Sequence, residues 1–293
     1  MCYQVVVPEE KVVEAARRKI RYEAFKAALA RSFQREFGRT RDCVEADRTL
    51  GLKGSITANG VQGLMYGSIY EEVVDFMFRK CGLTALDRFL DIGSGIGQIV
   101  TQAAAWAGCP SAGVEIVPKR HAIALRLLEA LKEEAKIAVD PGTSEALLYT
   151  DALARARLIE GDFVDKWDEV KDCTVVYLNN TGTWFKAKSG DPAKAKDSYE
   201  SKLVRLLRGV EHSVTLITMD MLHTPPQAWS QTEWTFTCTP TQRVATYHVG
   251  ELKFHVYKTN AGAWRCSHCG IVRPKYVQEC SCTNRKDLRP RRA

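Results

Sequence analysis

The segment FLDIGSGIGQ, residues 89–98, decides the fold. A short apolar run, typical of a buried strand, leads into a turn with glycine at every second position, and the residues after it are typical of a helix. Glycines let the backbone approach a ligand closely, and a helix N-terminus presents N–H groups to it. The segment therefore predicts a strand, a ligand-binding turn and a helix, as in a doubly wound α/β sheet.

The acidic residue ahead of this turn discriminates between possible ligands. A dinucleotide fingerprint would need a third glycine where this chain has Gln98. Asp91 lies just before the first glycine, Gly93, and its carboxylate would repel a pyrophosphate. It suits a ligand that carries an ammonium group, such as the methionine end of S-adenosylmethionine. We therefore predict that Asp91, Gly93, Gly95 and Gln98 bind this cofactor.

Two later strands end in further candidate cofactor contacts. Glu115 ends a strand predicted at residues 112–115, where an acidic residue accepts hydrogen bonds from ribose hydroxyls. Asp162 and Phe163 follow the next strand, where Asp162 would accept from an adenine amino group and Phe163 would flank the ring. Alone, these residues would more readily be read as a turn with an ordinary solvated aspartate. Their order behind the first two signals favours the cofactor.

Apolar runs alternate with helix-like segments through most of the chain, and this alternation predicts a parallel sheet covered on both faces. The strands are expected at residues 88–92, 112–115, 158–159, 174–179 and 214–219. The helices are expected at residues 8–37, 68–80, 98–107, 118–138, 145–156 and 198–207. Three more strands, at residues 234–237, 243–248 and 252–257, follow one another without helices and would complete the sheet in antiparallel orientation.

The first helix is expected to have one apolar face, and basic residues lie between the apolar positions in the sequence. The apolar face would comprise Val12, Val13, Ala16, Ile20, Ala24, Phe33 and Phe37. The basic residues are Arg17, Arg18, Arg21, Arg31 and Arg35. A solvated face is favoured for them over an anion-binding one.

Composition excludes several classes of protein. The chain has 293 residues, 45% of them hydrophobic and 26% charged, which is enough apolar material for a core and too much for disorder over most of the length. It contains no apolar run long enough to span a bilayer, and the N-terminal residues do not resemble a secretory signal. Ten cysteines without such a signal favour reduced thiols or metal. A net charge of +7 suits an anionic partner. We expect a soluble intracellular protein.

The fourth predicted strand ends in Asn179 and Asn180, beside the expected methyl donor. Two amides there can position a polar nucleophile without adding charge. Nucleic-acid enzymes that methylate amino groups often have prolines and an aromatic residue at this place, whereas this chain continues with Thr181 and Gly182. A flipped base would lack its usual stacking partner.

These motifs together resemble the Dot family (disruptor of telomeric silencing), the histone H3 lysine methyltransferases that lack a SET domain. The resemblance covers roughly residues 65–257 and rests on LDIGSGIGQ at 90–98, YG at 66–67, GVE at 113–115, GDF at 161–163 and NN at 179–180, in the family's order. It implies the seven-stranded class I S-adenosylmethionine-dependent methyltransferase fold, a Rossmann-like doubly wound sheet, with a helical N-terminal region. It implies as substrate a lysine in the globular core of nucleosomal histone H3, and a nuclear location.

The resemblance also implies catalytic residues, with some departures. Asn179 and the loop of Tyr66 would hold the reacting ends, and Asn179 would also contact the cofactor, as would Tyr66. The family has Tyr-Gly-Glu-Thr where this chain has YGSI at 66–69, and an aromatic residue where this chain has Thr181. The family's lysine channel uses a Trp and a Tyr on the last strands, for which the nearest matches are Tyr247 and Phe254.

The C-terminal part carries a separate cysteine cluster. The cysteines of this cluster are Cys266, Cys269, Cys280 and Cys282, spaced as C-x-x-C and C-x-C. This spacing favours one structural zinc over free or partly buried thiols. The basic segment 285–292 that follows is either a solvated tail or a non-specific contact to DNA phosphates or the histone acidic surface.

We predict three regions: a helical N-terminal region with a substrate-side loop at residues 1–64, a methyltransferase domain at 65–260, and a cysteine-rich knuckle with a basic tail at 261–293. The predicted activity is methyl transfer to nucleosomal histone H3. An RNA or other protein methyltransferase of the same fold is the first alternative. A catalytically inactive chromatin-binding module is the second.

Overall fold

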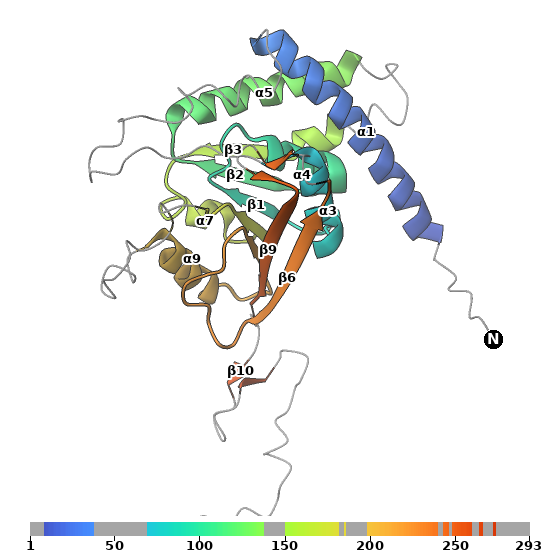
Figure 1. The fold of residues 1–293 in the computed structure, drawn as a ribbon. Helices are drawn as coiled ribbons and strands as arrows, with labels where there is room; N and C mark the ends of the chain where they lie inside the picture. Colours follow the sequence, from blue (N-terminus) through green and yellow to red (C-terminus); the bar gives the residue numbers. More distant parts are fainter. Residues whose placement is uncertain are drawn as a thin grey trace, which may run out of the picture.

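A computed structural model describes residues 9–37, 69–137, 150–181, 185, 198–239, 243–245, 248–259, 264–265 and 272–273. A seven-stranded sheet forms its centre, in the order β3-β2-β1-β4-β5-β9-β6 (Figure 1). The strands are β1 (Phe89–Ile92), β2 (Ser111–Glu115), β3 (Ala156–Glu160), β4 (Val175–Leu178), β5 (Thr215–Thr218), β6 (Ser230–Thr237) and β9 (Glu251–Lys258). Strands β1 to β5 are parallel to one another, and β9 is antiparallel to both β5 and β6. The predicted methyltransferase fold class is thereby confirmed.

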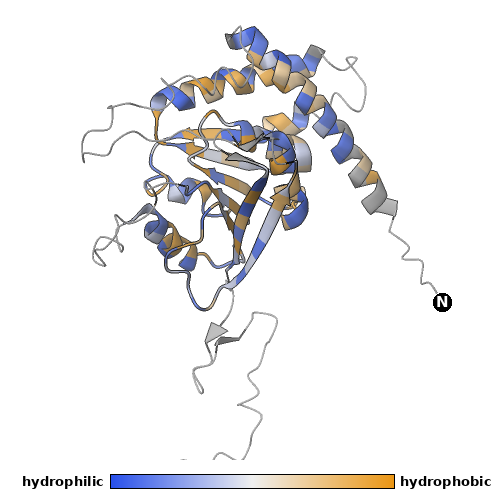
Figure 2. Cartoon of the chain, viewed as in Figure 1, coloured by the Kyte–Doolittle hydropathy of each residue, from blue (hydrophilic) through white to orange (hydrophobic). Residues whose placement is uncertain are grey.

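Helices cover both faces of the sheet (Figure 1). They are α1 (Glu9–Phe37), α3 (Glu71–Cys81), α4 (Gln98–Ala107), α5 (Pro118–Ile137), α7 (Trp167–Val170) and α9 (Tyr199–Arg208). Helices α3 and α4 pack on one face, where Phe78 contacts Phe89 with ring centroids 5.3 Å apart. Helices α7 and α9 pack on the opposite face around Leu90 and Val176. Figure 2 shows apolar residues along the central strands between these two layers. Because both faces are covered, most residues of the central strands are apolar, and Asp91 of β1 and Glu115 of β2 are buried acidic exceptions.

Two further pairs of short strands lie outside the main sheet. Strand β7 (Arg243–Ala245) pairs with β8 (His248–Val249), and β10 (Trp264–Arg265) pairs with β11 (Val272–Arg273). The prediction that residues 243–248 complete the main sheet was therefore wrong, because they form a two-stranded sheet with residue 249. Among the helices that the structure describes, none combines the length and the apolar character needed to cross a bilayer.

Helix α1 packs across α4 and α5, and the predicted helical N-terminal region is confirmed over its 29 residues (Figure 1). The predicted apolar face was only partly right. Phe33 is fully buried, but Val13 is 44% exposed and Ala16 is also exposed. Among the α1 side chains that the structure describes, the buried ones are those of Arg21, Phe25, Ala28, Leu29, Ser32 and Phe33. The buried stripe thus includes two polar residues, Arg21 and Ser32.

Of the α1 arginines whose side chains the structure describes, Arg21 is buried and binds partners within the chain, so the solvated-face interpretation was wrong for it. Its Nε donates to the carbonyl oxygen of Ala105 at 3.1 Å, and its Nη2 donates to that of Trp106 at 3.4 Å. These carbonyls lie in the last turn of α4, where the helix dipole favours a cation. The guanidinium carbon of Arg18 lies 4.1 Å from the centroid of the Trp106 ring.

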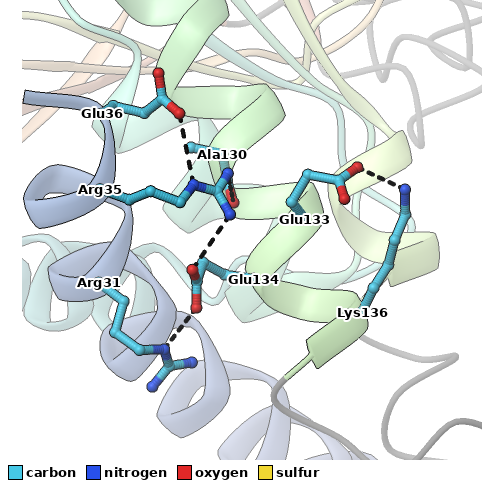
Figure 3. Close-up of polar contacts among 7 residues, drawn as sticks. All are labelled: Arg31, Arg35, Glu36, Ala130, Glu133, Glu134 and Lys136. Carbon is cyan, nitrogen blue, oxygen red and sulfur yellow. Dashed lines mark hydrogen bonds and ion pairs between the residues drawn. The ribbon is translucent and has the colours of Figure 1, made fainter.

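A second polar contact joins α1 to α5. Glu134 of α5 accepts from Nε of Arg31 at 2.6 Å and from Nη1 of Arg35 at 3.3 Å, as Figure 3 shows. The Nη2 of Arg35 also donates to the carbonyl oxygen of Ala130 at 3.3 Å. Glu134 is only 7% exposed, so its charge is compensated by two arginines from the neighbouring helix. This pairing fixes the position of α1 along α5.

Replacement of Arg21 tests whether this buried arginine holds α1 in place. We expect Arg21→Leu to lower the free energy of unfolding by about 2–4 kcal/mol, because two carbonyl oxygens at the end of α4 lose a charged donor. Arg31→Ala is the control. Its side chain is 47% exposed and Arg35 still pairs with Glu134, so the loss should be no more than about 1 kcal/mol. Urea unfolding measures the free energy of unfolding of both variants. Equal losses in the two variants would contradict the role of Arg21 in holding α1 in place.

Candidate active site

The glycine turn between β1 and α4 has the backbone that its sequence predicts. Gly93, Gly95 and Gly97 have φ of 76°, 56° and 77°, a region that favours glycine over other residues. The N–H groups of Gly93 and Ser94 both donate to the carbonyl oxygen of Val114, at 2.8 and 3.1 Å. The turn is thus tied to the end of β2. Helix α4 begins immediately after it, without a side-chain cap.

Gly113 of β2 makes this close approach possible. A Cβ atom at this position would lie 2.6 Å from the Cβ of Ser94 and 2.6 Å from a methyl carbon of Val100. Both atoms are near the backbone of the glycine turn or the first turns of α4, so any side chain here would push the turn off the sheet. The match of GVE at 113–115 to a family motif therefore has a steric reason.

Glu115 is buried beneath the glycine turn and holds it in place. One carboxylate oxygen accepts from the N–H of Gly95 at 2.7 Å, and the other accepts from the N–H of Val117 at 2.9 Å. The Nη1 of Arg120 lies 3.9 Å from this second oxygen. Burial raises the pKa of Glu115, while Arg120 and the two N–H groups act in the opposite direction. Glu115 therefore connects the end of β2 to the turn, in addition to its predicted contact with ribose.

Asp91 is a buried carboxyl group with an unusual pKa. It is 3% exposed and lies in β1 between Gly113 and Tyr177 of the neighbouring strands. Burial, and to a smaller extent the charge of Glu115, raises its pKa to about 8. A buried carboxylate is costly unless a cation compensates it. This site therefore fits a ligand that brings a positive charge to the glycine turn.

A cavity of about 290 Å³, which includes space open to solvent, lies at the carboxyl ends of β1, β2 and β3. Its lining residues are Ile92, Gly93, Val114, Ile116, Gly161, Asp162, Phe163, Phe185 and Tyr199. Such a cavity at the carboxyl edge of a doubly wound sheet is the expected place for a ligand. Its walls are mostly apolar and aromatic, and the Asp162 carboxylate is its charged group. These properties suit a flat, mostly apolar ring with a hydrogen-bond donor at its edge.

The two asparagines after β4 have different environments. Asn180 is fully buried: its Nδ2 donates to the carbonyl oxygen of Asp220 at 2.9 Å, and its Oδ1 accepts from the N–H of Asp220 at 2.7 Å. It therefore joins the ends of β4 and β5. Asn179 is half-buried, and its Oδ1 accepts from the hydroxyl of Thr181 at 2.7 Å. Because Leu178 pairs with Ile92, Asn179 lies at the same sheet edge as the glycine turn.

The remaining predicted site residues are either buried or outside the described part of the chain. Phe254 is fully buried in the layer of α3 and α4, with its ring centroid 6.3 Å from that of Phe76. Packing accounts for this position, so Phe254 is a core residue and does not line an open channel. Gln98 is also buried, at 3% exposure, in the first turn of α4. Tyr66 and Tyr247 lie outside the described residues.

The predicted zinc ligands also lie outside the described residues. They are Cys266, Cys269, Cys280 and Cys282. Within the described ranges, no group of three or more His, Cys, Asp or Glu side chains could hold a metal ion. The zinc site thus stays a prediction from cysteine spacing.

Sequence reasoning missed Ile116, Phe185 and Tyr199 of the cavity. Ile116 directly follows Glu115, so its position at the end of β2 was a usable signal. Tyr199 opens α9 after Ser198, a residue typical of helix N-caps. Phe185 lies between the fourth strand and this helix, and no local pattern marks it as a cavity residue.

Comparison with known proteins shows that part of the chain is similar to one family. Residues 59–189 match the model of the family described as histone methylation protein DOT1. The H3 lysine-79 specific histone-lysine N-methyltransferase of Emericella nidulans is 31% identical over 125 residues, 42% of this chain and 23% of that protein. Its counterpart in Kluyveromyces lactis is 35% identical over 117 residues, 40% of this chain and 19% of that protein. This chain thus matches about a fifth of the length of these relatives.

Solved structures are similar at a lower level. An O-methyltransferase from Bacillus cereus, in complex with SAH, has a TM-score of 0.44 and 10% identity over 79% of this chain and 97% of its own. An RNA methyltransferase from Salinibacter ruber, in complex with S-adenosyl-L-homocysteine, has a TM-score of 0.38 and 20% identity over 66% of this chain and 92% of its own. These scores support no inference about activity or substrate. The similarity to the DOT1 family of histone methylation proteins, predicted from the sequence motifs, is confirmed over residues 59–189.

Proposed function

We propose that this protein is a histone lysine N-methyltransferase that transfers a methyl group from S-adenosylmethionine to a lysine in the globular core of nucleosomal histone H3. The observation that carries the proposal is the DOT1 family match, because residues 59–189 include the glycine turn, Asp91, Glu115, the Asp162 segment and Asn179. These residues lie at one edge of the sheet. The relatives from Emericella nidulans and Kluyveromyces lactis are H3 lysine-79 specific enzymes.

The described residues fit the parts of S-adenosylmethionine. Asp91 and the turn at Gly93 and Gly95 would hold the methionine end, whose ammonium group compensates the buried carboxylate. Glu115 would accept from the ribose hydroxyls, since a carboxylate oxygen can accept a second hydrogen bond. The cavity beside Asp162 and Phe163 has the aromatic walls and the acceptor that an adenine ring requires. Gln98 would support the turn from the first residues of α4, beneath the ligand.

The chemistry needs little from the protein besides placement. The bound cofactor supplies an electrophilic methyl group on a sulfonium. The lysine nitrogen must be neutral, close and in line, and a dry channel lowers the pKa of that lysine from about 10.4. Asn179 would orient the nitrogen through its amide, and the Tyr66 loop would help to hold the reacting end of the cofactor. No general base is required for this step, because the lysine can lose its proton to solvent before it enters the channel, and the dry channel favours the neutral amine.

The wider assignments follow from the proposed substrate. The enzyme would work in the nucleus on nucleosomes, with non-specific contacts to DNA through basic segments such as 285–292. Residues 261–293 would form a knuckle around a structural zinc held by the four cysteines, beside the catalytic domain at 65–260. Tyr247 remains the candidate for the wall of the lysine channel. Helix α1 packs on α4 and α5, so it does not itself reach the substrate side. Within residues 1–64, the substrate side would therefore be formed by the predicted loop.

A panel of substrates tests the proposal. The protein is incubated with radiolabelled S-adenosylmethionine and, in parallel, intact nucleosomes, free histones and bulk RNA. We expect label on histone H3 in nucleosomes and little elsewhere. Label on RNA alone would overturn the substrate and favour the RNA methyltransferase. Cofactor binding without transfer to any substrate would overturn the activity, as the changes at Ser68 and Thr181 would allow, and favour the inactive chromatin-binding module.

The pKa of Asp91 predicts how cofactor affinity depends on pH. Below about pH 8, Asp91 is protonated in the free protein, whereas the bound ammonium group favours the carboxylate. Binding should therefore release a proton, and the affinity for S-adenosylhomocysteine should rise with pH up to about 8, by at most about tenfold per unit. Calorimetry in buffers of different ionisation enthalpy measures the proton release. It should disappear in Asp91→Asn, and a wild-type affinity that is flat between pH 6 and pH 8, roughly the titration range of Asp91, would contradict this role.

The same shift has an effect on the stability of the ligand-free protein. The folded pKa of Asp91, about 8, lies above the ordinary value of 3.8, so the unfolded chain loses this proton first as the pH rises. The contribution of Asp91 to stability is therefore full at acid pH and falls as the pH rises from about 4 to about 8. Bound cofactor should reverse this trend.

A further inference from the structure

The side chain of Tyr199 forms a hydrogen bond to the Asp162 carboxylate, the charged group of the cavity. Its phenol O–H donates to Oδ2 of Asp162 at 2.7 Å. Its ring centroid lies 5.7 Å from that of Phe163 and 6.4 Å from that of Phe185, and all three aromatic residues line the cavity. The contact therefore joins the first turn of α9 to the segment that follows β3.

Hydrogen bonds at the first turn of α9 fix the position of the Tyr199 hydroxyl. The Ser198 hydroxyl oxygen accepts from the N–H of Ser201 at 3.1 Å, which caps the helix. The N–H of Glu200 donates to the carbonyl oxygen of Phe185 at 3.1 Å, so the helix start and the cavity wall are tied together. The ammonium nitrogen of Lys202 lies 4.8 Å from the centroid of the Tyr199 ring. Tyr199 is thus positioned by its own helix, independently of any ligand.

The hydrogen bonds at Asp162 fix the plane of its carboxylate. Oδ1 accepts from the N–H of Val164 at 2.9 Å, and Oδ2 accepts from Tyr199. Each oxygen of an ionised carboxylate has room for a second hydrogen bond, so the group can still accept from a ligand. Burial and the bond to Asp162 raise the pKa of Tyr199, and the phenol stays a donor at neutral pH. Asp162 is therefore presented to the cavity as an acceptor in one orientation.

We propose that Tyr199 is a positioning residue that sets the preference of this cavity for a 6-aminopurine over a 6-oxopurine, by orienting the Asp162 carboxylate. This inference rests on the proposed function, which places the adenine ring in the cavity. The 6-amino group of adenine donates a hydrogen bond to an oriented carboxylate. The 6-oxo group of hypoxanthine can only accept and would face the carboxylate oxygen directly, so it is repelled. If the carboxylate could rotate freely, both the attraction of the 6-amino group and the repulsion of the 6-oxo group would be weaker.

The test measures the dissociation constants of S-adenosylhomocysteine and S-inosylhomocysteine for the full chain and for Tyr199→Phe, Asp162→Asn and the double variant. We expect Tyr199→Phe to weaken binding of the adenosyl ligand about tenfold and the inosyl ligand much less, which narrows the preference. In the Asp162→Asn background, the loss of the Tyr199 hydroxyl should add little, because its effect passes through the carboxylate.

Tyr257→Phe is the matched control. Its hydroxyl accepts from the N–H of Leu222 at 2.9 Å, away from the cavity lining, so this variant should keep the preference whatever it costs in stability. Equal weakening of both ligands by Tyr199→Phe, or an additive effect with Asp162→Asn, would overturn the positioning role and leave the proposed function intact. A wild-type chain that binds neither ligand would overturn both.

Discussion

Gly95→Arg should raise the dissociation constant for S-adenosylhomocysteine by more than about 1000-fold and abolish methyl transfer. Gly95 is buried and has a φ of 56°, and its N–H donates to Glu115 at 2.7 Å. An arginine would add the strain of a left-handed backbone, about 1–2 kcal/mol, and a buried charge that costs several kcal/mol more. Each 1.4 kcal/mol is about tenfold in affinity, so the combined cost is sufficient. Isothermal titration calorimetry measures the loss.

Gly82→Arg is the matched control for the backbone strain. Gly82 ends α3 with a φ of 69°, and a Cβ at this position would meet no atom within 4 Å. This variant bears the same kind of strain in an open place, so its cofactor affinity should be unchanged. Gly95→Ala, which lacks the charge, should weaken binding only about tenfold. Wild-type affinity in Gly95→Arg would show that the glycine turn is not the cofactor site.

Asn179→Ala should lower kcat on nucleosomes about 100-fold while the affinity for S-adenosylhomocysteine falls by less than about tenfold. The reason is that the amide is proposed to orient the lysine nitrogen, a contact that matters most during transfer. Asn179 is half-buried at the edge of the sheet beside the glycine turn. Steady-state kinetics with saturating cofactor separate kcat from binding. Full activity in this variant would refute the role of Asn179.

Asn180→Ala provides the contrast, because the neighbouring amide is structural. It would break two hydrogen bonds to the backbone of Asp220: the N–H of Asp220 loses the Asn180 oxygen, while its carbonyl oxygen still accepts from the hydroxyl of Thr218 at 2.8 Å. The free energy of unfolding should fall by about 2–4 kcal/mol, measured by urea unfolding. Where Asn180→Ala remains folded, its kcat should exceed that of Asn179→Ala. The reverse order would mean that the roles of the two amides have been exchanged.

The fold could be predicted where local signals were strong. Helix α4 was predicted at 98–107 and lies at Gln98–Ala107, because glycine ends it on both sides. Strand β6 was predicted at 234–237 but begins at Ser230, since it is an edge strand whose first residues are polar and exposed. Helix α1 was found with nearly correct bounds, but not its buried stripe. Arg21 occupies that stripe by bonding to carbonyl groups of α4, a tertiary contact that hydrophobic periodicity does not register.

In the candidate site too, local sequence patterns predict some residues, and others depend on tertiary packing. Asp91, Glu115 and Asp162 each follow or end a predicted strand, and parallel strands bring their carboxyl ends to one edge, so the sequence was sufficient to bring them together. Tyr199 and Phe185 reach the cavity only through the packing of α9 on the sheet, which no local pattern encodes. Phe254 was chosen as an aromatic residue on a late strand. Which face of that strand it occupies depends on the packing of α3, and it belongs to the core.

Mass spectrometry of histone H3 peptides, after incubation of nucleosomes with S-adenosylmethionine and the protein, decides whether nucleosomal H3 is the substrate. We expect added methyl groups on a lysine of the H3 globular core with the wild-type chain and with Gly82→Arg, and none with Gly95→Arg. Unmodified H3 with a wild-type chain that binds S-adenosylhomocysteine would contradict the claim that nucleosomal H3 is the substrate.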